Sequence, residues 1–285
     1  MYSPPSDPAE QQRMEAHLAR AAQALQVTCA SQAPFWGWDG RTLGRAGTTA
    51  KGERVWLRLI SAPAAKAEGK LWEGAEHAQI VFGDLGGYRP ALLTVHDMVD
   101  GETAYRAELS QYLDQPVLSD DPIVRRPLEL PDTWWTDLAN ALEKVATATT
   151  TDRVAVRHQY IDRAVPQFLN MPAPPVTRWA TVHGDLHWAN LTSPGLRLLD
   201  WEAWGRAPWG YDQATLWAYS LTQPDLAARV RTAFPELGTP ETYAAETVVC
   251  AELLQTVSRG ANTILAEPLQ EWAARLRSEA PHQQR

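Results

Sequence analysis

The chain has 285 residues, of which 45% are hydrophobic and 21% are charged, and its formal net charge is −8 at pH 7. These proportions are typical of a soluble globular protein with enough residues for one large domain or two lobes. The acidic balance argues against a general nucleic-acid binder, which would present a basic face. The sequence contains no apolar run of eighteen residues and no basic start followed by an apolar stretch, so we expect a cytoplasmic protein without a membrane partner.

The first third of the chain predicts a leading helix followed by strands. An Asp-Pro start and apolar residues at helical spacing indicate an amphipathic helix over 7–26. From residue 35 onward, short segments separated by glycine turns are typical of strands, and residues 54–60 alternate in polarity as a half-buried strand does. A helix is expected over roughly 64–78 and a buried strand over 90–99.

The remainder of the chain predicts mainly helices. Apolar residues recur at helical spacing over 132–148, 152–169, 240–258 and 262–278, and a short apolar strand is expected over 179–182. The two cysteines, Cys29 and Cys250, lie far apart in apolar surroundings and without metal-ligand spacing. We therefore expect two buried free thiols and no disulfide.

The most informative stretch is residues 183–190, His-Gly-Asp-Leu-His-Trp-Ala-Asn, followed closely by an acidic segment that contains Asp200. Ser-Pro-Gly at 193–195 predicts a tight turn, because Pro presets φ and Gly accepts a positive φ. A hairpin closed by this turn would bring Asn190 near Asp200 and close to the loop that carries Asp185. Two carboxylates and an amide oxygen suit a hard cation such as Mg²⁺.

A loop carboxylate followed by an Asn and a second Asp is also the catalytic apparatus of kinase-like phosphotransferases. The pattern His-x-Asp-x-x-x-x-Asn, followed by a short hairpin and an Asp, resembles the aminoglycoside phosphotransferase and choline kinase family. The resemblance implies that Asp185 is the catalytic base and that Asn190 and Asp200 hold Mg²⁺. It further implies that His183 anchors the loop and that Asp212 is a structural residue.

The same resemblance implies an α+β, two-lobed protein-kinase-like fold. A small β-rich N-terminal lobe would occupy residues 1–95, a hinge residues 96–100, and a mainly helical C-terminal lobe residues 101–285. His96 and Met98 fall in the implied hinge, whose backbone groups would hydrogen-bond the adenine of ATP. The glycine pattern of the N-terminal lobe fits neither the protein-kinase glycine-rich loop nor a Walker A sequence.

The implied N-terminal lobe departs from the family at one position. Relatives carry a lysine on the third strand that pairs the phosphates of ATP, whereas this strand has Arg58 at the corresponding place. Arginine binds phosphate bidentately, but its planar guanidinium is not equivalent to an ammonium group. Its acidic partner would be Glu73 or Glu76 on the following helix, and the spacing does not choose between them. A surface arginine on an alternating strand is the alternative interpretation.

The implied reaction transfers the γ-phosphoryl group of ATP, with Mg²⁺, to a hydroxyl of a small molecule such as an aminoglycoside-like or other antibiotic. In aminoglycoside-modifying relatives, acidic residues near the C-terminal end meet the cationic substrate, and Glu246 and Glu252 are candidates, although solvated helix faces explain them equally well. Three alternatives remain open: a peptide Ser/Thr kinase, a nucleotide-binding pseudokinase suggested by the missing lysine, and a zinc hydrolase using His183, Asp185 and His187. Neither the acceptor nor the oligomeric state follows from the sequence.

Overall fold

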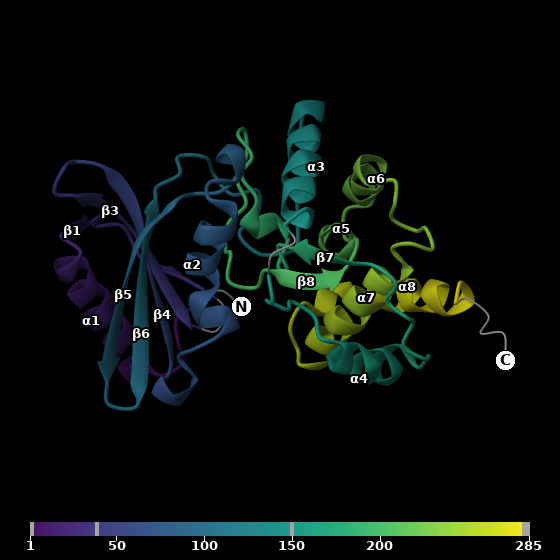
Figure 1. The fold of residues 1–285 in the computed structure, drawn as a ribbon, viewed down its shortest axis with the longest axis horizontal. Helices are drawn as coiled ribbons and strands as arrows, with labels where there is room; N and C mark the ends of the chain where they lie inside the picture. The colour runs from purple at the N-terminus through teal and green to yellow at the C-terminus, as the bar shows by residue number, and fades with distance from the viewer. Residues whose placement is uncertain (1–2, 38–39, 149–150, 281–285) are drawn as a thin grey trace. The chain divides into compact units, whose positions relative to one another are not determined.

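The computed structural model describes residues 3–37, 40–148 and 151–280. The chain divides into two compact units, Met1–Pro116 (unit 1) and Val117–Arg285 (unit 2). Figure 1 shows the sheet-rich unit 1 in purple and blue, and the mainly helical unit 2 in teal, green and yellow. Within the described ranges, no helix has both the length and the apolar character needed to cross a bilayer. A sheet followed by a helical region confirms the predicted α+β fold class.

Unit 1 is built on an antiparallel sheet whose strands lie in the order β1-β3-β4-β6-β5, with β2 paired to β3. The strands are β1 (Val27–Cys29), β2 (Phe35–Trp36), β3 (Thr42–Thr49), β4 (Arg54–Pro63), β5 (Leu92–Asp100) and β6 (Thr103–Gln111). The predicted strand over 54–60 is confirmed as part of β4. Its residues alternate, because Val55, Leu57 and Leu59 are buried while Trp56 and Arg58 are only partly covered.

Helix α1 (Pro8–Ala24) covers one face of this sheet. It begins where the sequence predicts, since the Asp7 side chain caps it by accepting a hydrogen bond from the Ala9 amide at 2.9 Å. Leu18 on its inner face packs in one buried cluster with Leu57 and Leu59 of β4. Burying a leucine side chain contributes roughly 1.5–3 kcal/mol, so this cluster fixes which face of β4 points toward α1.

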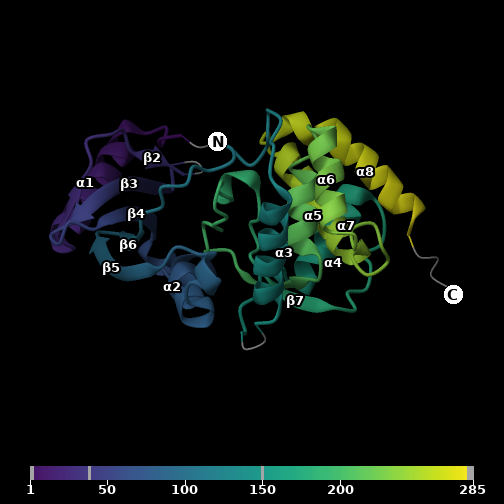
Figure 2. The ribbon, with the colours of Figure 1, turned by 90° about the horizontal axis from the view of Figure 1, so that it is seen from above.

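Helix α2 (Lys70–Phe82) lies on the opposite face of the sheet, as Figure 2 shows. A short 3-10 turn, η1 (Ala64–Lys66), precedes it, so the helix begins later than the sequence predicts. Trp72 packs against Ile60 of β4 and Ala104 of β6 in a separate buried cluster. The face of β4 that carries Arg58 is therefore the face on which α2 lies.

The structure corrects the expected lobe boundary at residue 95 and the expected hinge at 96–100. Residues 96–100 form the second half of β5, where His96 pairs with Ala107 and Met98 pairs with Tyr105 of β6. Unit 1 continues to Pro116, so β6 belongs to it. The sequence hides β6 because two of its buried positions carry charged side chains, which obscure the apolar pattern of a strand.

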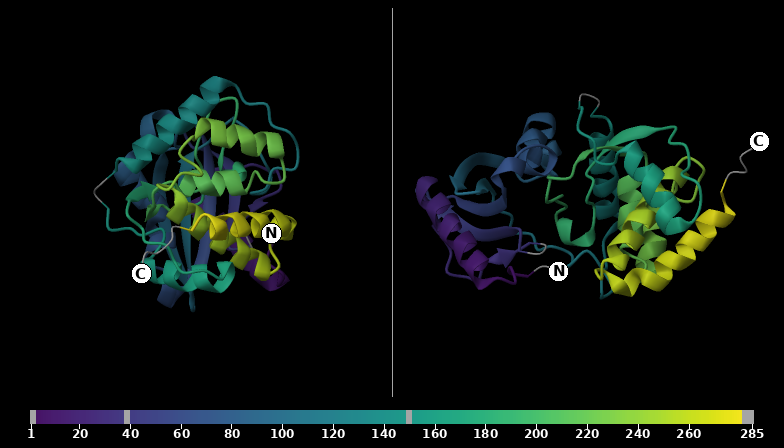
Figure 3. Two further views of the ribbon diagram at one scale, coloured as in Figure 1. Left: turned by 90° about the vertical axis from the view of Figure 1, so that its right-hand side faces the viewer. Right: turned by 90° about the horizontal axis from the view of Figure 1, so that it is seen from below.

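Unit 2 combines a two-stranded antiparallel sheet, β7 (Trp179–Val182) with β8 (Gly205–Pro208), and a set of helices. The central helix α7 packs against α4, α5 and α8, which Figure 3 shows from two sides. The helices are α3 (Asp132–Ala146), α4 (His158–Leu169), α5 (Tyr211–Ala218), α6 (Pro224–Ala233), α7 (Tyr243–Ser258) and α8 (Ala266–Ser278). The predicted helices and the strand over 179–182 are confirmed, whereas α6 was not expected. Cys29 and Cys250 are both free, with Cys29 half-buried and Cys250 buried.

Candidate active site

The candidate catalytic loop begins where β7 ends, within unit 2. The chain leaves the strand at His183 and turns at Gly184, whose φ is +84°. A Cβ atom on Gly184 would lie 2.5 Å from the carbonyl oxygen of Ala203, so both the backbone conformation and the space require glycine. This turn places Asp185 at the start of the polar segment.

Asp212, in the first turn of α5, holds this loop through its backbone. The Asp212 carboxylate is buried and accepts hydrogen bonds from the amides of His183 (2.7 Å) and Gly184 (2.9 Å). Burial raises the pKa of Asp212, and the neighbouring His183 and the two amide donors offset this effect only in part. Two bonds from consecutive amides to one carboxylate fix the direction in which the loop leaves β7.

His183 is fully buried, and both of its ring nitrogens are engaged. Nε2 lies 2.8 Å from the Leu199 carbonyl oxygen and donates to it, so Nδ1 is the acceptor for the Asp185 amide at 3.3 Å. The imidazole ring also meets Trp201 edge-on, with the ring centroids 4.8 Å apart. His183 therefore ties the loop to the returning segment, and it has no free nitrogen with which to bind zinc as the hydrolase alternative requires.

The Asp185 carboxylate is partly open to solvent, with 43% of its side chain exposed. Its Oδ2 lies 3.5 Å from His187 Nε2 and 3.4 Å from Asn190 Nδ2. Desolvation raises the pKa of Asp185, but His187, His183 and the Asn190 amide together outweigh it, so the pKa lies below its ordinary value. The group is therefore a carboxylate at neutral pH, able to accept a hydrogen bond from an incoming hydroxyl.

Asn190 is buried and is oriented by the same loop. Its Nδ2 donates to the Asp185 carbonyl oxygen at 2.9 Å and lies 3.3 Å from His187 Nε2. Because the amide nitrogen is engaged on this side, Oδ1 is the atom that Asn190 can offer to a cation. The two predicted residues Asp185 and Asn190 are thus brought together.

The predicted hairpin is present and leads back to Asp200. Leu191 pairs with Leu198 in an antiparallel bridge, and the Leu199 amide donates to the Asn190 carbonyl at 2.9 Å. Asp200 follows immediately and has a φ of +60°, an uncommon conformation for a residue with a side chain. The pairing of Asn190 with Leu199 places the two expected metal ligands on adjacent segments, and an amide oxygen with a carboxylate suits Mg²⁺.

Tryptophans anchor the turn between Asp185 and Asn190. The turn is the 3-10 segment η3 (Trp188–Asn190), and the Trp188 indole is fully buried. Its Nε1 donates to the Ser220 hydroxyl at 3.0 Å, and its ring lies 6.3 Å from Trp134 of α3 in a stacked arrangement. A rigid apolar anchor of this kind holds the neighbouring polar residues in one position.

The two acidic candidates of α7 have different surroundings. Glu246 is buried and accepts hydrogen bonds from the Gly238 amide (2.6 Å) and the Thr242 hydroxyl (2.8 Å), so it stabilises the start of α7 and is not available to a substrate. Glu252 is only partly buried and accepts a hydrogen bond from the Tyr211 hydroxyl at 2.6 Å. Burial, followed by the Glu252 charge and hydrogen bond, raises the pKa of Tyr211 well above its ordinary value, and the charge of Asp185 contributes in the same direction.

The residues expected to meet the nucleotide lie in unit 1. Arg58 contacts Glu108 of β6, with Nη1 3.4 Å from Oε2, whereas Glu76 contacts Arg106 at 3.3 Å. Glu73 forms no ion pair with any other side chain that the structure describes. The expected pairing of Arg58 with Glu76 on α2 is therefore not found, because the acid directly across the sheet is closer and Glu76 serves another arginine.

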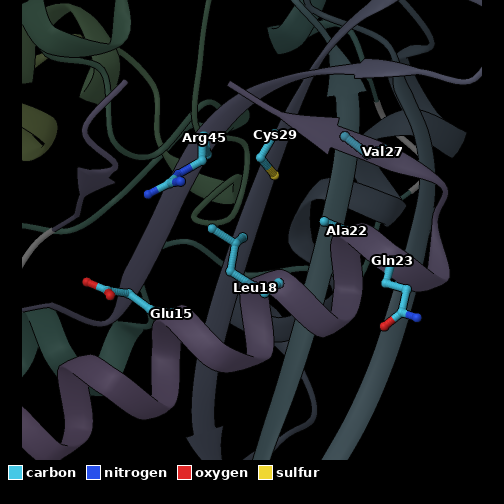
Figure 4. Close-up of a pocket in the computed structure, with 8 residues that line it drawn as sticks. Glu15, Leu18, Ala22, Gln23, Val27, Cys29 and Arg45 are labelled. Atoms are coloured by element: carbon cyan, nitrogen blue, oxygen red, sulfur yellow. The ribbon is translucent and has the colours of Figure 1, made fainter. Parts of the chain in front are cut away.

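A hollow of about 480 Å³ also occurs in unit 1, between α1 and the strands β1 and β3. Figure 4 shows Leu18 and Ala22 of α1 facing Val27, Cys29 and Arg45 across it. This hollow lies on the α1 side of the sheet, so it is separated from Arg58 by the thickness of the sheet. It is not part of the candidate site.

Three further residues contact the predicted site residues, and the sequence did not single them out for these contacts. His187 contacts both Asp185 and Asn190, Tyr211 binds Glu252, and Glu108 contacts Arg58. The spacing of His187 from Asp185 was available as a signal, but it also matched a zinc site. No local pattern connects Glu108 with Arg58, which lie 50 residues apart.

No family model and no curated protein sequence matches the chain. Solved structures do match its fold. A thermostable mutant of the aminoglycoside phosphotransferase APH(4)-Ia is 16% identical, with a TM-score of 0.56 over 89% of this chain and 94% of that one. The amicoumacin kinase hAmiN, in complex with AMP-PNP, Ca²⁺ and Ami, is 12% identical, with a TM-score of 0.59 over 96% and 97%. The macrolide 2'-phosphotransferase MphH from Brachybacterium faecium is 13% identical, with a TM-score of 0.52 over 95% and 100%.

These similarities span nearly the whole length of each chain at low sequence identity, so what they establish is the fold. The resemblance seen in residues 183–212 is confirmed at that level, because the structures matched include an aminoglycoside phosphotransferase. The chain has the kinase-like fold that is shared with small-molecule phosphotransferases.

Proposed function

We propose that this protein is an ATP- and Mg²⁺-dependent phosphotransferase that moves the γ-phosphoryl group to a hydroxyl of a small molecule. One observation carries the proposal: the partly exposed Asp185 carboxylate is held by a loop whose other members, Asn190 and Asp200, offer oxygen ligands suited to a metal. The fold shared with three small-molecule phosphotransferases supports the same reaction class. The acceptor, by analogy with them, is an antibiotic or a related hydroxylated compound.

Asp185 would act on the acceptor hydroxyl. Its carboxylate accepts the hydroxyl hydrogen bond and orients the oxygen toward the γ-phosphorus. As the new O–P bond forms and the bond to the β-phosphate oxygen breaks, the hydroxyl proton passes to the carboxylate. The His187 and Asn190 contacts keep the carboxylate in one orientation for this step.

Asn190 and Asp200 would hold the metal. Their donor atoms are an amide oxygen and a carboxylate, which match the preference of Mg²⁺ for hard oxygen ligands. When bound there, Mg²⁺ would neutralise negative charge that develops on the phosphates during transfer. The similar amicoumacin kinase was solved with AMP-PNP and Ca²⁺, which supports nucleotide and metal binding here.

Unit 1 would contribute to nucleotide binding through Arg58, a permanent cation suited to phosphate. His96 and Met98, whose backbone groups the sequence suggested for adenine, lie in the edge strand β5 and not in a connecting segment. The connection that follows β6, residues 112–116, takes their place in this proposal as the segment for adenine.

The test is consumption of the ATP γ-phosphate, with Mg²⁺, against a panel of aminoglycosides, macrolides, other hydroxylated antibiotics, choline and amino sugars. For the acceptor that is phosphorylated, Asp185→Ala should lower turnover by about 10²–10⁴-fold, the range for a positioned acid–base group. Asp162→Ala, which removes an exposed carboxylate from α4, is the matched control and should leave turnover unchanged. Full activity in Asp185→Ala would remove Asp185 from the mechanism, and nucleotide binding without turnover would favour a binding protein.

A further inference from the structure

We propose that Glu108 is the positioning residue for Arg58. Glu108 pairs with the Arg58 guanidinium and holds it in place, which is the role expected of Glu73 or Glu76 on the following helix. The inference rests on the proposed function, since it concerns how unit 1 presents a cation to the nucleotide phosphates. Its elements all lie within unit 1.

The first support is strand register. Arg58 of β4 and Glu108 of β6 are directly opposite partners in the antiparallel pairing, so their side chains leave the same face of the sheet. Nη1 and Oε2 lie 3.4 Å apart, and the side chains are only 17% and 7% exposed. Such a pair of adjacent charged side chains, largely removed from water, strongly restricts the conformations that each side chain can adopt.

The second support is that the acid on α2 is committed elsewhere. Glu76 contacts Arg106 Nη1 at 3.3 Å, and the same arginine binds both carboxylate oxygens of Asp97 at 2.8 and 2.7 Å. Arg106 also donates to the Trp72 carbonyl of α2 at 3.0 Å. This network fastens α2 to β6 and β5, and it leaves the acid of β6 to face Arg58.

The third support is local charge. Arg89, in the loop after α2, donates to Gln79 Oε1 at 2.6 Å and to the Gly83 carbonyl at 2.7 Å, which fixes its position. Burial lowers the pKa of Arg89 to about 10, and the negative charge of Glu108 opposes this effect, so the two side chains interact electrostatically. Glu108 therefore lies among three cationic groups, because Arg106 is also close enough to be affected by its charge. Asp97 and Glu76 already bind Arg106, and among the described residues no other acidic side chain lies directly across the sheet from Arg58.

The consequence for binding is specific. If Glu108 is made neutral, Arg58 loses the partner that orients it, and its guanidinium is free to adopt other rotamers. The loss of one charge-assisted contact to a phosphate corresponds to roughly 10–10²-fold in affinity. We therefore expect Glu108→Gln to weaken binding of Mg²⁺–AMP-PNP by roughly 10–10²-fold, with Glu108→Asp in between.

The experiment measures Mg²⁺–AMP-PNP affinity by calorimetry, and thermal unfolding in parallel, for the wild type, Glu108→Gln, Glu108→Asp, Arg58→Met and the Arg58→Met/Glu108→Gln double variant. Asp100→Asn is the control. It breaks the contact between Asp100 Oδ2 and Nε2 of the buried His17 of α1 (3.1 Å), which involves neither Arg58 nor Glu108. It should lower the unfolding temperature and leave affinity unchanged.

The proposal expects the double variant to bind as weakly as Arg58→Met alone, because Glu108 acts through Arg58. Additive losses in the double variant, undiminished affinity in Glu108→Gln, or an equal loss of affinity in Asp100→Asn would overturn it. If Glu108→Gln does not fold, the comparison of Glu108→Asp with wild type decides the question in the same way. A wild type that binds no nucleotide would overturn the proposed function itself, an outcome distinct from a wild type that binds while the Glu108 variants bind equally well.

Discussion

Replacing Gly184 by alanine tests whether the backbone geometry of the candidate catalytic loop controls activity. Gly184 has a φ of +84°, and an added Cβ would lie 2.5 Å from the Ala203 carbonyl oxygen and 3.0 Å from its carbonyl carbon. Gly260, in the turn after α7, has a φ of +87° but no atom within 4 Å of an added Cβ. The two glycines share the conformational requirement and differ in the steric one, so Gly260→Ala is a matched control.

The expected magnitudes follow from these two terms. An alanine held at positive φ costs about 1–2 kcal/mol, and the stiffer unfolded chain returns about 0.4–1 kcal/mol, so Gly260→Ala should lose roughly 0.5–1 kcal/mol of unfolding free energy. At Gly184, overpacking against backbone adds about 1–3 kcal/mol, for a total loss of roughly 1.5–4 kcal/mol. Relieving the contact from 2.5 Å to an ordinary 3.4 Å requires a shift of about 0.9 Å.

This shift of Gly184 would also move Asp185, the proposed catalytic base. Gly184 donates its amide to Asp212, and Asp185 is the next residue, so the loop cannot move without moving the carboxylate. A misplacement of about 1 Å costs on the order of 10²-fold in rate, and we expect a loss of this size for Gly184→Ala. Urea unfolding and turnover on the identified acceptor measure the two effects. Equal stability losses in both variants, with turnover retained in Gly184→Ala, would refute the reasoning.

Two further predictions concern charged groups of unit 2. Because the folded protein lowers the pKa of Asp185, its carboxylate stabilises the fold above its unfolded pKa, and this stabilisation is lost as the pH falls through the lower folded pKa. The stability difference between wild type and Asp185→Asn, from urea unfolding, should therefore shrink as the pH is lowered below about 4, and a constant difference would contradict it. Glu252→Gln should raise KM about tenfold for amine-bearing acceptors and leave KM for neutral acceptors unchanged, as expected when one charge-assisted hydrogen bond is lost. Equal effects on both acceptor classes would show that Glu252 only supports Tyr211.

Local sequence signals were sufficient for most of the helices, although not for α6 or for the first residues of α2 and α4, and for the hairpin of unit 2. The Asp7 cap, the alternation of β4 and the chain reversal at 193–195 each depend on residues within a few positions, and each is found where it was expected. The reversal differs in one detail, because Gly195 does not take the positive φ on which the prediction relied. The predicted boundary fell too early in the chain because the sequence of β6 lacks the apolar pattern of a strand. Its Arg106 and Glu108 are charged and buried, and their partners come from other strands and from α2.

Within the candidate site, too, some contacts follow from local sequence and others depend on how distant segments pack. Asp185, Asn190 and Asp200 are joined by local hydrogen bonds or by the pairing of one hairpin, so their proximity follows from the order of residues. The contact between Tyr211 and Glu252 spans 41 residues and depends on how α5 packs against α7. No pattern in either helix specifies that packing angle, so the partner of Glu252 became visible only in the structure.

The arginine at position 58 shows why a residue that departs from an expected pattern cannot be judged by itself. Read alone, the missing lysine favours a protein that has lost catalysis. Guanidinium and ammonium groups need different partners, since the planar guanidinium is held best by an acid that approaches in its own plane, whereas an ammonium accepts a partner from any side. An acid directly across the sheet is fixed by the strand register, while an acid on a helix is fixed only by how that helix packs. Arg58 and Glu108 therefore form a pair that is fixed by the sheet itself, and under the proposed function its guanidinium chemistry is suited to phosphate binding.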